Sequence, residues 1–256
     1  MVLVVFGAGA VPVAAATAAA SGNGPPACRI ADTTTALTSY ANWSQTLVDW
    51  TLRLPAGYAP RDLVPVARAG ISGSGLIRSL VIPDLAAMTR AARAAGAPIA
   101  VESAYRSYAT QISVFNSWVR ALGYDEAIVG SARAGHSEHQ LGVALDFKTP
   151  GGAAPWSTGG YDWATSKAGA WMIRNAWAFG FVLSYPRGKS SQVCYGYEPW
   201  HYRYYGRALA GAIRASGLPP RVWLWQHQTV EPPAPPSPRG TGAIRVSPIP
   251  WLVGAP

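Results

Sequence analysis

Short apolar patterns of two different periods alternate along the middle of the chain, and this alternation constrains the fold more than any other feature. Helical spacing begins near Ile82 and Ser107, and Gly96 and Gly123 stand where these helices would end. Short stretches of strand-like composition lie between and after them. No internal repeat interrupts the pattern. The sequence therefore predicts one α+β domain.

The expected elements can be placed by residue number. Helical patterns cover residues 40–54, 82–95, 108–122, 125–134, 167–179 and 207–215. Strand patterns cover residues 63–67, 99–105, 143–148, 181–185 and 200–204. Pro55 and Gly57 break the first helical pattern, and Ser107 is expected to be the N-cap of the third.

Composition favours a folded chain with a basic surface. Apolar residues make up 49% of the 256 residues and charged residues only 13%, which is typical of a globular protein with one good core. The net charge of +9 indicates an anionic partner, or serves only to keep the protein soluble. Because no arginine-rich run or nucleic-acid motif is present, we expect no nucleic acid as partner.

The two ends of the chain differ from its middle. Residues 1–20 carry no charge and end in a run of small residues, which is the pattern of a signal peptide. Whether this segment is cleaved or stays as an anchor is left open. Residues 21–39 are expected to be a linker, and residues 40–229 the folded domain. The prolines of residues 230–256 predict an extended tail. We therefore expect a secreted or extracytoplasmic protein.

The only two cysteines are Cys28 and Cys194. In an exported protein an even number of cysteines favours a disulfide, whereas two buried free thiols are the alternative. Such a bridge would close a long loop, worth about 4–5 kcal/mol in the chain-entropy model. It would also bring the N-terminal segment close to Glu198 and His201.

Two short stretches contain the side chains that a catalytic metal needs. Residues 137–146 contribute His139 and Asp146, and residues 198–201 contribute Glu198 and His201. A catalytic zinc takes three protein ligands and leaves one position for water, whereas structural sites are closed, often by cysteines. Two cysteines are too few for a closed site of that kind. The sequence predicts Zn2+ held by the two histidines and the aspartate.

The strand patterns assign these side chains to particular faces. Period-two alternation puts Val143, Leu145 and Phe147 on a buried face, and Ala144 and Asp146 on the opposite one. Gly142 permits the turn that brings His139 back over the side of Asp146.

In the second stretch the same alternation separates polar from aromatic residues. His201 and Arg203 share one face, opposite three aromatic residues, Trp200, Tyr202 and Tyr204. Glu198 precedes this strand at the Pro199 corner, so it can approach a metal-activated water without being a ligand.

Three blocks of the sequence together resemble a known family. They are Ser137-x-His139-x-x-Gly142-x-Ala144-x-Asp146, Glu198-x-Trp200-His201, and Ser103-Ala104-Tyr105-Arg106-Ser107-Tyr108 with Gln111 one turn later. In order and spacing they are similar to the D-alanyl-D-alanine carboxypeptidase and dipeptidase family of zinc peptidases, over roughly residues 80–217. That family includes the vancomycin-resistance carboxypeptidases and some phage endolysins.

The resemblance implies a fold and a set of residue roles. The fold would be a small antiparallel sheet flanked by helices, of the type shared by DD-peptidases and Hedgehog domains. The zinc ligands would be His139, Asp146 and His201. Glu198 would be the general acid/base, and Arg106 would steady the carbonyl oxygen. Four further residues would lie near the substrate: Ser137, Gln111, Tyr105 and Trp200. His136 has no metal role in this scheme, and we expect it at the rim of the site.

The implied function is hydrolysis of the terminal D-Ala of peptidoglycan stem peptides by metal-activated water. Endopeptidase and D-Ala-D-Ala dipeptidase activities of the same family are alternatives. Two further alternatives are non-catalytic: a wall-binding zinc domain, and a structural zinc domain of the Hedgehog kind. We expect a monomer at the cell wall, with stem peptides and anionic wall polymers as its partners.

Overall fold

The computed structural model describes residues 24–157 and 162–227. The predicted signal peptide (residues 1–20) and proline-rich tail (residues 230–256) lie outside the described residues. Within the described part of the chain, no helix has the length and apolar character that crossing a membrane requires.

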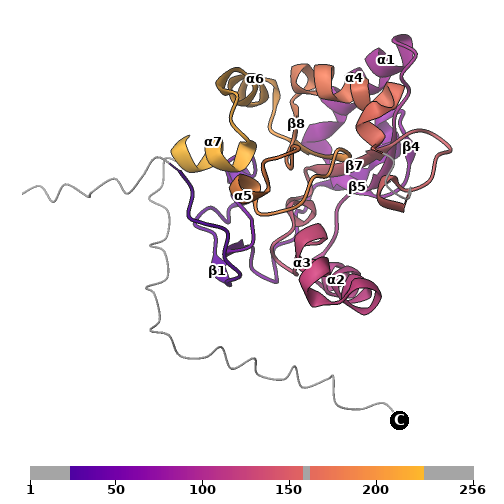
Figure 1. Cartoon of the computed structure of the whole chain (residues 1–256). Coiled ribbons are helices and arrows are strands. Elements are labelled where there is room, and N and C mark those ends of the chain that lie inside the picture. The colour runs from indigo at the N-terminus through magenta and orange to yellow at the C-terminus, as the bar shows by residue number, and fades with distance from the viewer. Residues whose placement is uncertain (1–23, 158–161, 228–256) are drawn as a thin grey trace, which may run out of the picture.

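A five-stranded sheet forms the centre of the molecule (Figure 1). Its strands, in spatial order, are β4 (Ser72–Gly73), β6 (Ala100–Ser103), β7 (Ala144–Lys148), β9 (His201–Tyr204) and β8 (Phe181–Leu183). The pairs β6–β7, β7–β9 and β9–β8 are antiparallel, whereas the edge strand β4 pairs with β6 in parallel. Two small two-stranded sheets lie outside it, β1 (Thr33–Thr34) with β2 (Leu52–Arg53) and β3 (Leu63–Pro65) with β5 (Leu76–Arg78).

Helices lie on both sides of this sheet. They are α1 (Ile82–Ala94), α2 (Tyr108–Leu122), α3 (Tyr124–Gly130), α4 (Lys167–Asn175), α5 (Ser190–Val193), α6 (Arg207–Ser216) and α7 (Pro220–His227). In the view of Figure 1, α1, α4 and α6 lie above the sheet, and α2 and α3 stand together below it. The predicted α+β fold, a small and mainly antiparallel sheet flanked by helices, is confirmed.

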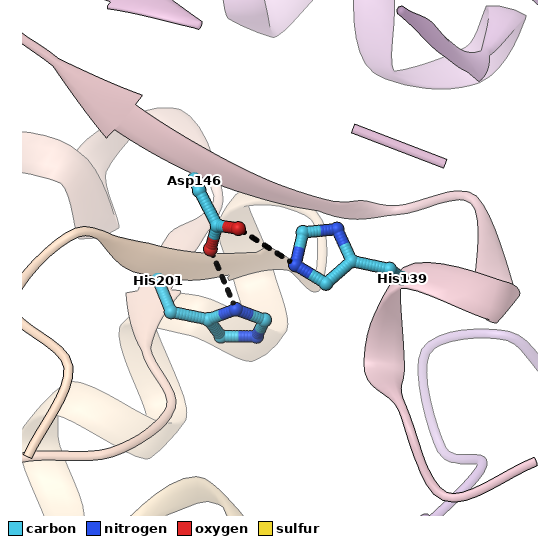
Figure 2. A group of neighbouring side chains, drawn as sticks. All are labelled: His139, Asp146 and His201. Carbon is cyan, nitrogen blue, oxygen red and sulfur yellow. Dashed lines mark hydrogen bonds and ion pairs between the residues drawn. The ribbon is translucent and has the colours of Figure 1, made fainter. Parts of the chain in front are cut away.

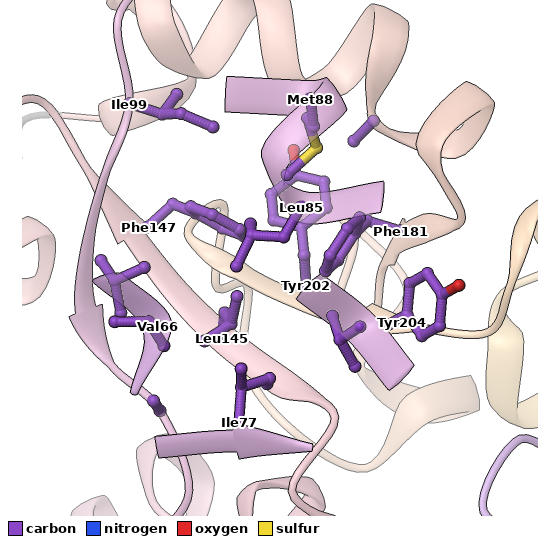
Figure 3. Packing of buried hydrophobic residues seen from close by; sticks show 14 of the residues in the cluster. Val66, Ile77, Leu85, Met88, Ile99, Leu145, Phe147, Phe181, Tyr202 and Tyr204 are labelled. Atoms are coloured by element: carbon purple, nitrogen blue, oxygen red, sulfur yellow. The ribbon is translucent and has the colours of Figure 1, made fainter. Parts of the chain in front are cut away.

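The core fills the space between the sheet and α1 (Figure 3). Leu145 and Phe147 of β7 and Tyr202 of β9 point into it, together with Leu85 and Met88 of α1. These side chains come from alternate strand positions, as the sequence predicted. Because alternate positions point to opposite faces, the polar residues between them face away from the core. This placement gives the sheet a polar face on which a site can form.

The predicted helix over residues 40–54 is wrong. Only a 3-10 turn, Tyr40–Asn42, and the short strand β2 form there. Polar side chains in this segment bond to the backbone and so compete with a helix. The Thr46 hydroxyl donates to the Leu37 carbonyl at 2.9 Å, and the Asp49 carboxylate accepts from the backbone N–H groups of Thr51 and Leu52. Apolar spacing alone therefore misled the prediction.

The other differences concern ends and short elements. The helix predicted over residues 125–134 ends at Gly130, and the one over 167–179 continues beyond Asn175 only as a 3-10 helix, Ala176–Phe179. The elements β1, β4, β5, α5 and α7 were not predicted. The first four of these are too short to carry a readable period.

The predicted disulfide is present between Cys28 and Cys194, whose Cα atoms lie 5.2 Å apart. A buried ion pair reinforces the same connection, because Arg221 bonds to Asp49 at 2.6 Å and to the Pro26 carbonyl at 3.0 Å. The described part of the predicted linker is thus attached to the domain next to the segment that precedes β9.

Candidate metal centre and active site

His139, Asp146 and His201 meet on the polar side of the sheet (Figure 2). One potential ligand atom from each lies within 4.8 Å of the others, and all three side chains are buried. The predicted ligand set is therefore brought together from three separate segments of the chain.

The fold positions each of the three by a local rule. Asp146 and His201 are direct register partners on the antiparallel strands β7 and β9, so their side chains leave the sheet side by side. His139 lies on the 3-10 helix Glu138–Leu141, which Gly142 ends with a left-handed backbone at φ 70°. This turn directs the chain from His139 into β7.

The ring nitrogens of the two histidines have different partners. His139 Nδ1 lies 2.6 Å from the Ala104 carbonyl, which can only accept, so this nitrogen carries the proton. His139 Nε2 is buried and makes no hydrogen bond, although it lies 3.1 Å from Asp146 Oδ2. His201 Nδ1 lies 2.9 Å from Asp146 Oδ1. A buried imidazole nitrogen without a hydrogen bond, next to a second imidazole and a carboxylate, fits the donor set of a catalytic zinc site.

The electrostatics of the cluster follow from burial and close pairing. Burial, helped by the charge of Arg106, lowers the pKa of His139 to about 4. Burial also opposes charge on His201, but hydrogen bonds to the carboxylates of Asp146 and Glu138 outweigh it and raise the pKa of His201 to about 10. Burial would raise the pKa of Asp146, yet both histidines hold it well below the ordinary value. The cluster thus keeps a carboxylate beside one neutral imidazole at neutral pH.

Glu198 and Arg106 lie next to the three ligands and come from different segments of the chain, before β9 and after β6. Glu198 Oε2 lies 3.9 Å from His201 Nδ1, too far for a hydrogen bond. Burial, with the nearby charge of Asp146 and against the pull of His201, raises the pKa of Glu198 to about 7. Arg106 follows β6, donates to Ser103 Oγ at 3.3 Å, and holds Nη1 3.9 Å from Asp146 Oδ2. A carboxyl group poised near neutrality and a cation therefore flank the ligand cluster.

All five of these side chains line one cavity of about 440 Å³. Two of the predicted substrate contacts, Ser137 and Trp200, also line it. The remaining wall comes mainly from the helices α2 and α3 and from the loops before β9. It includes five aromatic residues: Trp118, Trp156, Tyr185, Tyr195 and Tyr197. Two acidic residues, Glu102 and Glu126, also line the cavity.

The structure does not bring Gln111 and Tyr105 to the wall of this cavity. Gln111 is fully buried on α2, where its amide donates to the Ala132 carbonyl at 2.6 Å. Tyr105 is partly buried, and its backbone N–H donates to the Leu76 carbonyl. Their substrate contacts stay predictions, and the geometry assigns Gln111 to packing α2 against the segment after α3.

The prediction that His136 lies at the rim is wrong. His136 is only 1% exposed, with Nδ1 2.6 Å from the Asp49 carbonyl and Nε2 2.9 Å from Asp32 Oδ1. Asp32 and Asp49, both in the N-terminal segment, therefore hold the ring of His136 inside the domain. The sequence next to His136 gives no sign of these contacts.

Sequence reasoning also missed Glu138. This carboxylate is buried beside His201, with Oε2 3.0 Å from His201 Nε2. Burial would raise its pKa, but Arg203 and the neighbouring hydrogen bonds lower it to about 2. Tyr185, stacked on the His201 ring with centroids 4.8 Å apart, was missed as well. The only sequence signal for Glu138 was its position next to a ligand, which does not specify a partner.

The comparisons with known proteins agree with this geometry. The family model for VanY, D-alanyl-D-alanine carboxypeptidase, matches residues 75–207. A D-alanyl-D-alanine carboxypeptidase of Enterococcus faecalis is 34% identical over 69% of this chain. This chain spans 63% of the length of that relative, and 63% of a Bacillus subtilis relative.

Two solved structures share the fold. The LD-carboxypeptidase LdcB is 30% identical, with a TM-score of 0.61 over 71% of this chain and 86% of its own. A mutant of the vancomycin-resistance D,D-pentapeptidase VanY, in complex with Zn(II), is 29% identical, with a TM-score of 0.59 over 71% of this chain and 99% of its own. The predicted fold and family are both confirmed. This chain belongs to the VanY family of D-alanyl-D-alanine carboxypeptidases.

Proposed function

We propose that the protein is a zinc-dependent D,D-carboxypeptidase that removes the terminal D-Ala from peptidoglycan stem peptides. One observation carries the proposal. His139, Asp146 and His201 converge at a single cavity, and Glu198 and Arg106 line the same cavity. The metal ligands, the base and the arginine can therefore act on one bound peptide. The zinc complex of VanY and the name of the Enterococcus faecalis relative support the choice of metal and of bond.

The residues around the ligands divide the work of peptide hydrolysis. Zn2+ held by the three ligands supplies a Lewis acid and makes water nucleophilic near neutral pH. Glu198 accepts the proton of the attacking water and passes it to the leaving amine. The Arg106 guanidinium donates to the carbonyl oxygen as negative charge develops there, a contribution of about 3–4 kcal/mol in comparable sites.

The extent and the lining of the cavity favour a polymer-linked peptide. Its lining runs from the ligand cluster along α2 and α3 to the loops around Trp156 and Tyr197, which leaves room for more than two amino acids. The exposed Trp156 ring can pack against the backbone of an extended peptide. We therefore favour cleavage of a stem peptide over hydrolysis of free D-Ala-D-Ala.

An L,D-carboxypeptidase is the second candidate, because LdcB matches this chain as well as VanY does. The two activities differ in the residue before the scissile bond. A D,D-carboxypeptidase cleaves after the D-Ala at position four of a pentapeptide, whereas an L,D-carboxypeptidase cleaves after the L-configured centre at position three of a tetrapeptide. Both would use the same ligands and the same base.

The test is mass analysis of products from synthetic stem peptides incubated with zinc-loaded protein. We expect a pentapeptide ending in D-Ala-D-Ala to lose one alanine, and a chelator to stop the reaction. Loss of alanine from the tetrapeptide alone would establish the L,D activity instead. Release of the intact dipeptide, cleavage of a cross-linked peptide, or no cleavage would favour a dipeptidase, an endopeptidase or a binding domain respectively.

We further propose that the protein acts outside the cytoplasm at the cell wall. The Cys28–Cys194 disulfide supports this placement, since such bridges persist in oxidising compartments. The net charge of +9 suits a location among anionic wall polymers. Cell fractionation with detection of the protein in the wall and medium fractions tests the placement, and a purely cytoplasmic location would contradict it.

A further inference from the structure

The carboxylate of Glu138 is buried behind the proposed metal ligands, and both of its oxygens have partners. Oε2 accepts from the Ser184 hydroxyl at 2.6 Å and lies 3.0 Å from His201 Nε2. Oε1 accepts from Arg203 Nη1 at 3.0 Å. The side chain is only 7% exposed, so water does not compete for these contacts.

This arrangement determines which nitrogen of His201 can face a metal. A carboxylate paired with the Arg203 cation is ionised and can only accept, so the facing Nε2 of His201 must carry a hydrogen. When the ring is neutral, as metal binding requires, its lone pair is then on Nδ1, the atom that points to Asp146. The Tyr185 ring, stacked on the imidazole at an interplanar angle of 27°, holds the plane of the ring.

Glu138 is itself held from behind. Arg203 is fully buried, and its Nη2 donates to the carbonyls of Trp43 at 2.7 Å and Thr46 at 2.8 Å. Both carbonyls belong to the N-terminal segment, before the region that the family model matches. A continuous set of contacts thus runs from this segment through Arg203 and Glu138 to His201.

We propose that Glu138 is the positioning residue that fixes the tautomer and orientation of His201 for metal binding, with Arg203 and Ser184 holding it in place. The inference rests on the proposed zinc site. Carboxylates that accept from a ligating histidine have this effect in metal sites generally, and removing one weakens metal affinity by about 10–100-fold.

The most informative variant is Glu138→Gln, which keeps the shape of the side chain. Its amide has one accepting and one donating end, and the donors of Arg203 claim the accepting oxygen. The amide nitrogen is then turned to His201 Nε2, which must accept, so the proton moves to Nδ1 and blocks the metal-facing lone pair. The substitution is therefore expected to reverse the tautomer rather than merely loosen the ring.

The chain offers a matched control in Asp49→Asn. Asp49 is 1% exposed, pairs with the buried Arg221 at 2.6 Å, and does not contact His139, Asp146 or His201. Asp49→Asn therefore removes one negative charge from a buried carboxylate, as Glu138→Gln does. Ser184→Ala is a milder variant, because it removes one hydrogen bond to Glu138 and leaves both the carboxylate and Arg203 in place.

The experiment measures zinc affinity by competition with a chromophoric chelator, the melting temperature of the metal-free protein, and histidine tautomers by long-range 1H–15N NMR of the zinc-loaded protein. We expect Glu138→Gln to bind zinc about 10–100-fold more weakly and Ser184→Ala about threefold to tenfold more weakly. Asp49→Asn should melt at a lower temperature with unchanged zinc affinity. In the wild type, the His201 ring should carry its hydrogen on Nε2.

The outcomes separate this inference from the proposed function. Zinc affinity of Glu138→Gln equal to wild type, or an equal loss in Asp49→Asn, would overturn the positioning role while leaving the zinc site intact. If Glu138→Gln does not fold, unchanged affinity in Ser184→Ala, or a hydrogen on Nδ1 of His201 in the wild type, would overturn it instead. Wild-type protein that does not bind zinc would overturn the proposed function together with this inference.

Discussion

Asp146 and His201 face each other across the strand pair β7–β9, and their side chains meet with Oδ1 and Nδ1 2.9 Å apart. Two of the three proposed ligands are therefore set by sheet register alone, because register partners on one face of an antiparallel pair have neighbouring side chains. A shift of one residue would turn either side chain into the core. The geometry of the metal site thus depends on the same register that buries Leu145 and Tyr202.

Separate alanine substitutions of Glu198 and His201 should distinguish the base from the metal ligand. We expect Glu198→Ala to bind zinc normally and to lose about 10²–10⁴-fold in kcat, because only proton transfer is removed. His201→Ala should lose both zinc and turnover, because it removes a ligand. Zinc content by atomic emission and product release by mass analysis check both variants. Near-normal turnover in Glu198→Ala would remove the assigned base.

Arg106 should contribute to the transition state and not to the metal. Arg106→Met keeps much of the length of the side chain without its donors, and we expect kcat/KM to fall about 10²–10³-fold with zinc affinity little changed. Steady-state kinetics on the pentapeptide provide the measurement. A rise in KM at constant kcat would instead show that Arg106 binds substrate and transition state equally.

The buried His136 should make stability depend on pH. Burial and the charge of Arg133 lower its pKa below the ordinary value of 6.5, against the pull of Asp32. Since the unfolded chain binds this proton more tightly, the stability involved is present above pH 6.5 and is lost as the pH falls below it. In His136→Gln the free energy of unfolding should fall less steeply between about pH 7 and pH 5. Urea unfolding of both proteins at several pH values tests this, and parallel curves would contradict it.

Two helical glycines should respond to alanine in opposite directions. A Cβ on Gly169 of α4 would lie 2.2 Å from the Trp163 carbonyl oxygen, so we expect Gly169→Ala to lose about 1–3 kcal/mol of unfolding free energy. A Cβ on Gly211 of α6 would meet no atom within 4 Å, and Gly211→Ala should gain about 0.5–1 kcal/mol. Equal effects in denaturant unfolding would show that α4 does not pack closely on the segment before it.

The ligands could be predicted because the patterns that orient their side chains lie within a few residues of them in the sequence. The alternation in 143–148 separates Leu145 from Asp146, and the same rule separates Tyr202 from His201, so each strand could be oriented before the sheet was known. Gly142 marked the turn that brings His139 over Asp146, and the structure has the expected left-handed backbone there.

What could not be predicted depends on contacts between distant segments. Glu138 acquires its role only when β8 and β9 bring Ser184, His201 and Arg203 around it. The ring of His136 is held by Asp32 and Asp49, which lie 104 and 87 residues earlier in the chain. The polar side chains of that segment also override its helical spacing. Neither effect leaves a periodic signal in the sequence.

Titration of metal-free protein with zinc, followed by release of D-Ala from a stem pentapeptide, tests the account most directly. The account predicts that activity is absent without metal, rises linearly, and stops rising at one equivalent of zinc, with a single D-Ala lost from each peptide. Full activity in the rigorously metal-free protein, or one equivalent of bound zinc without any cleavage, would contradict it.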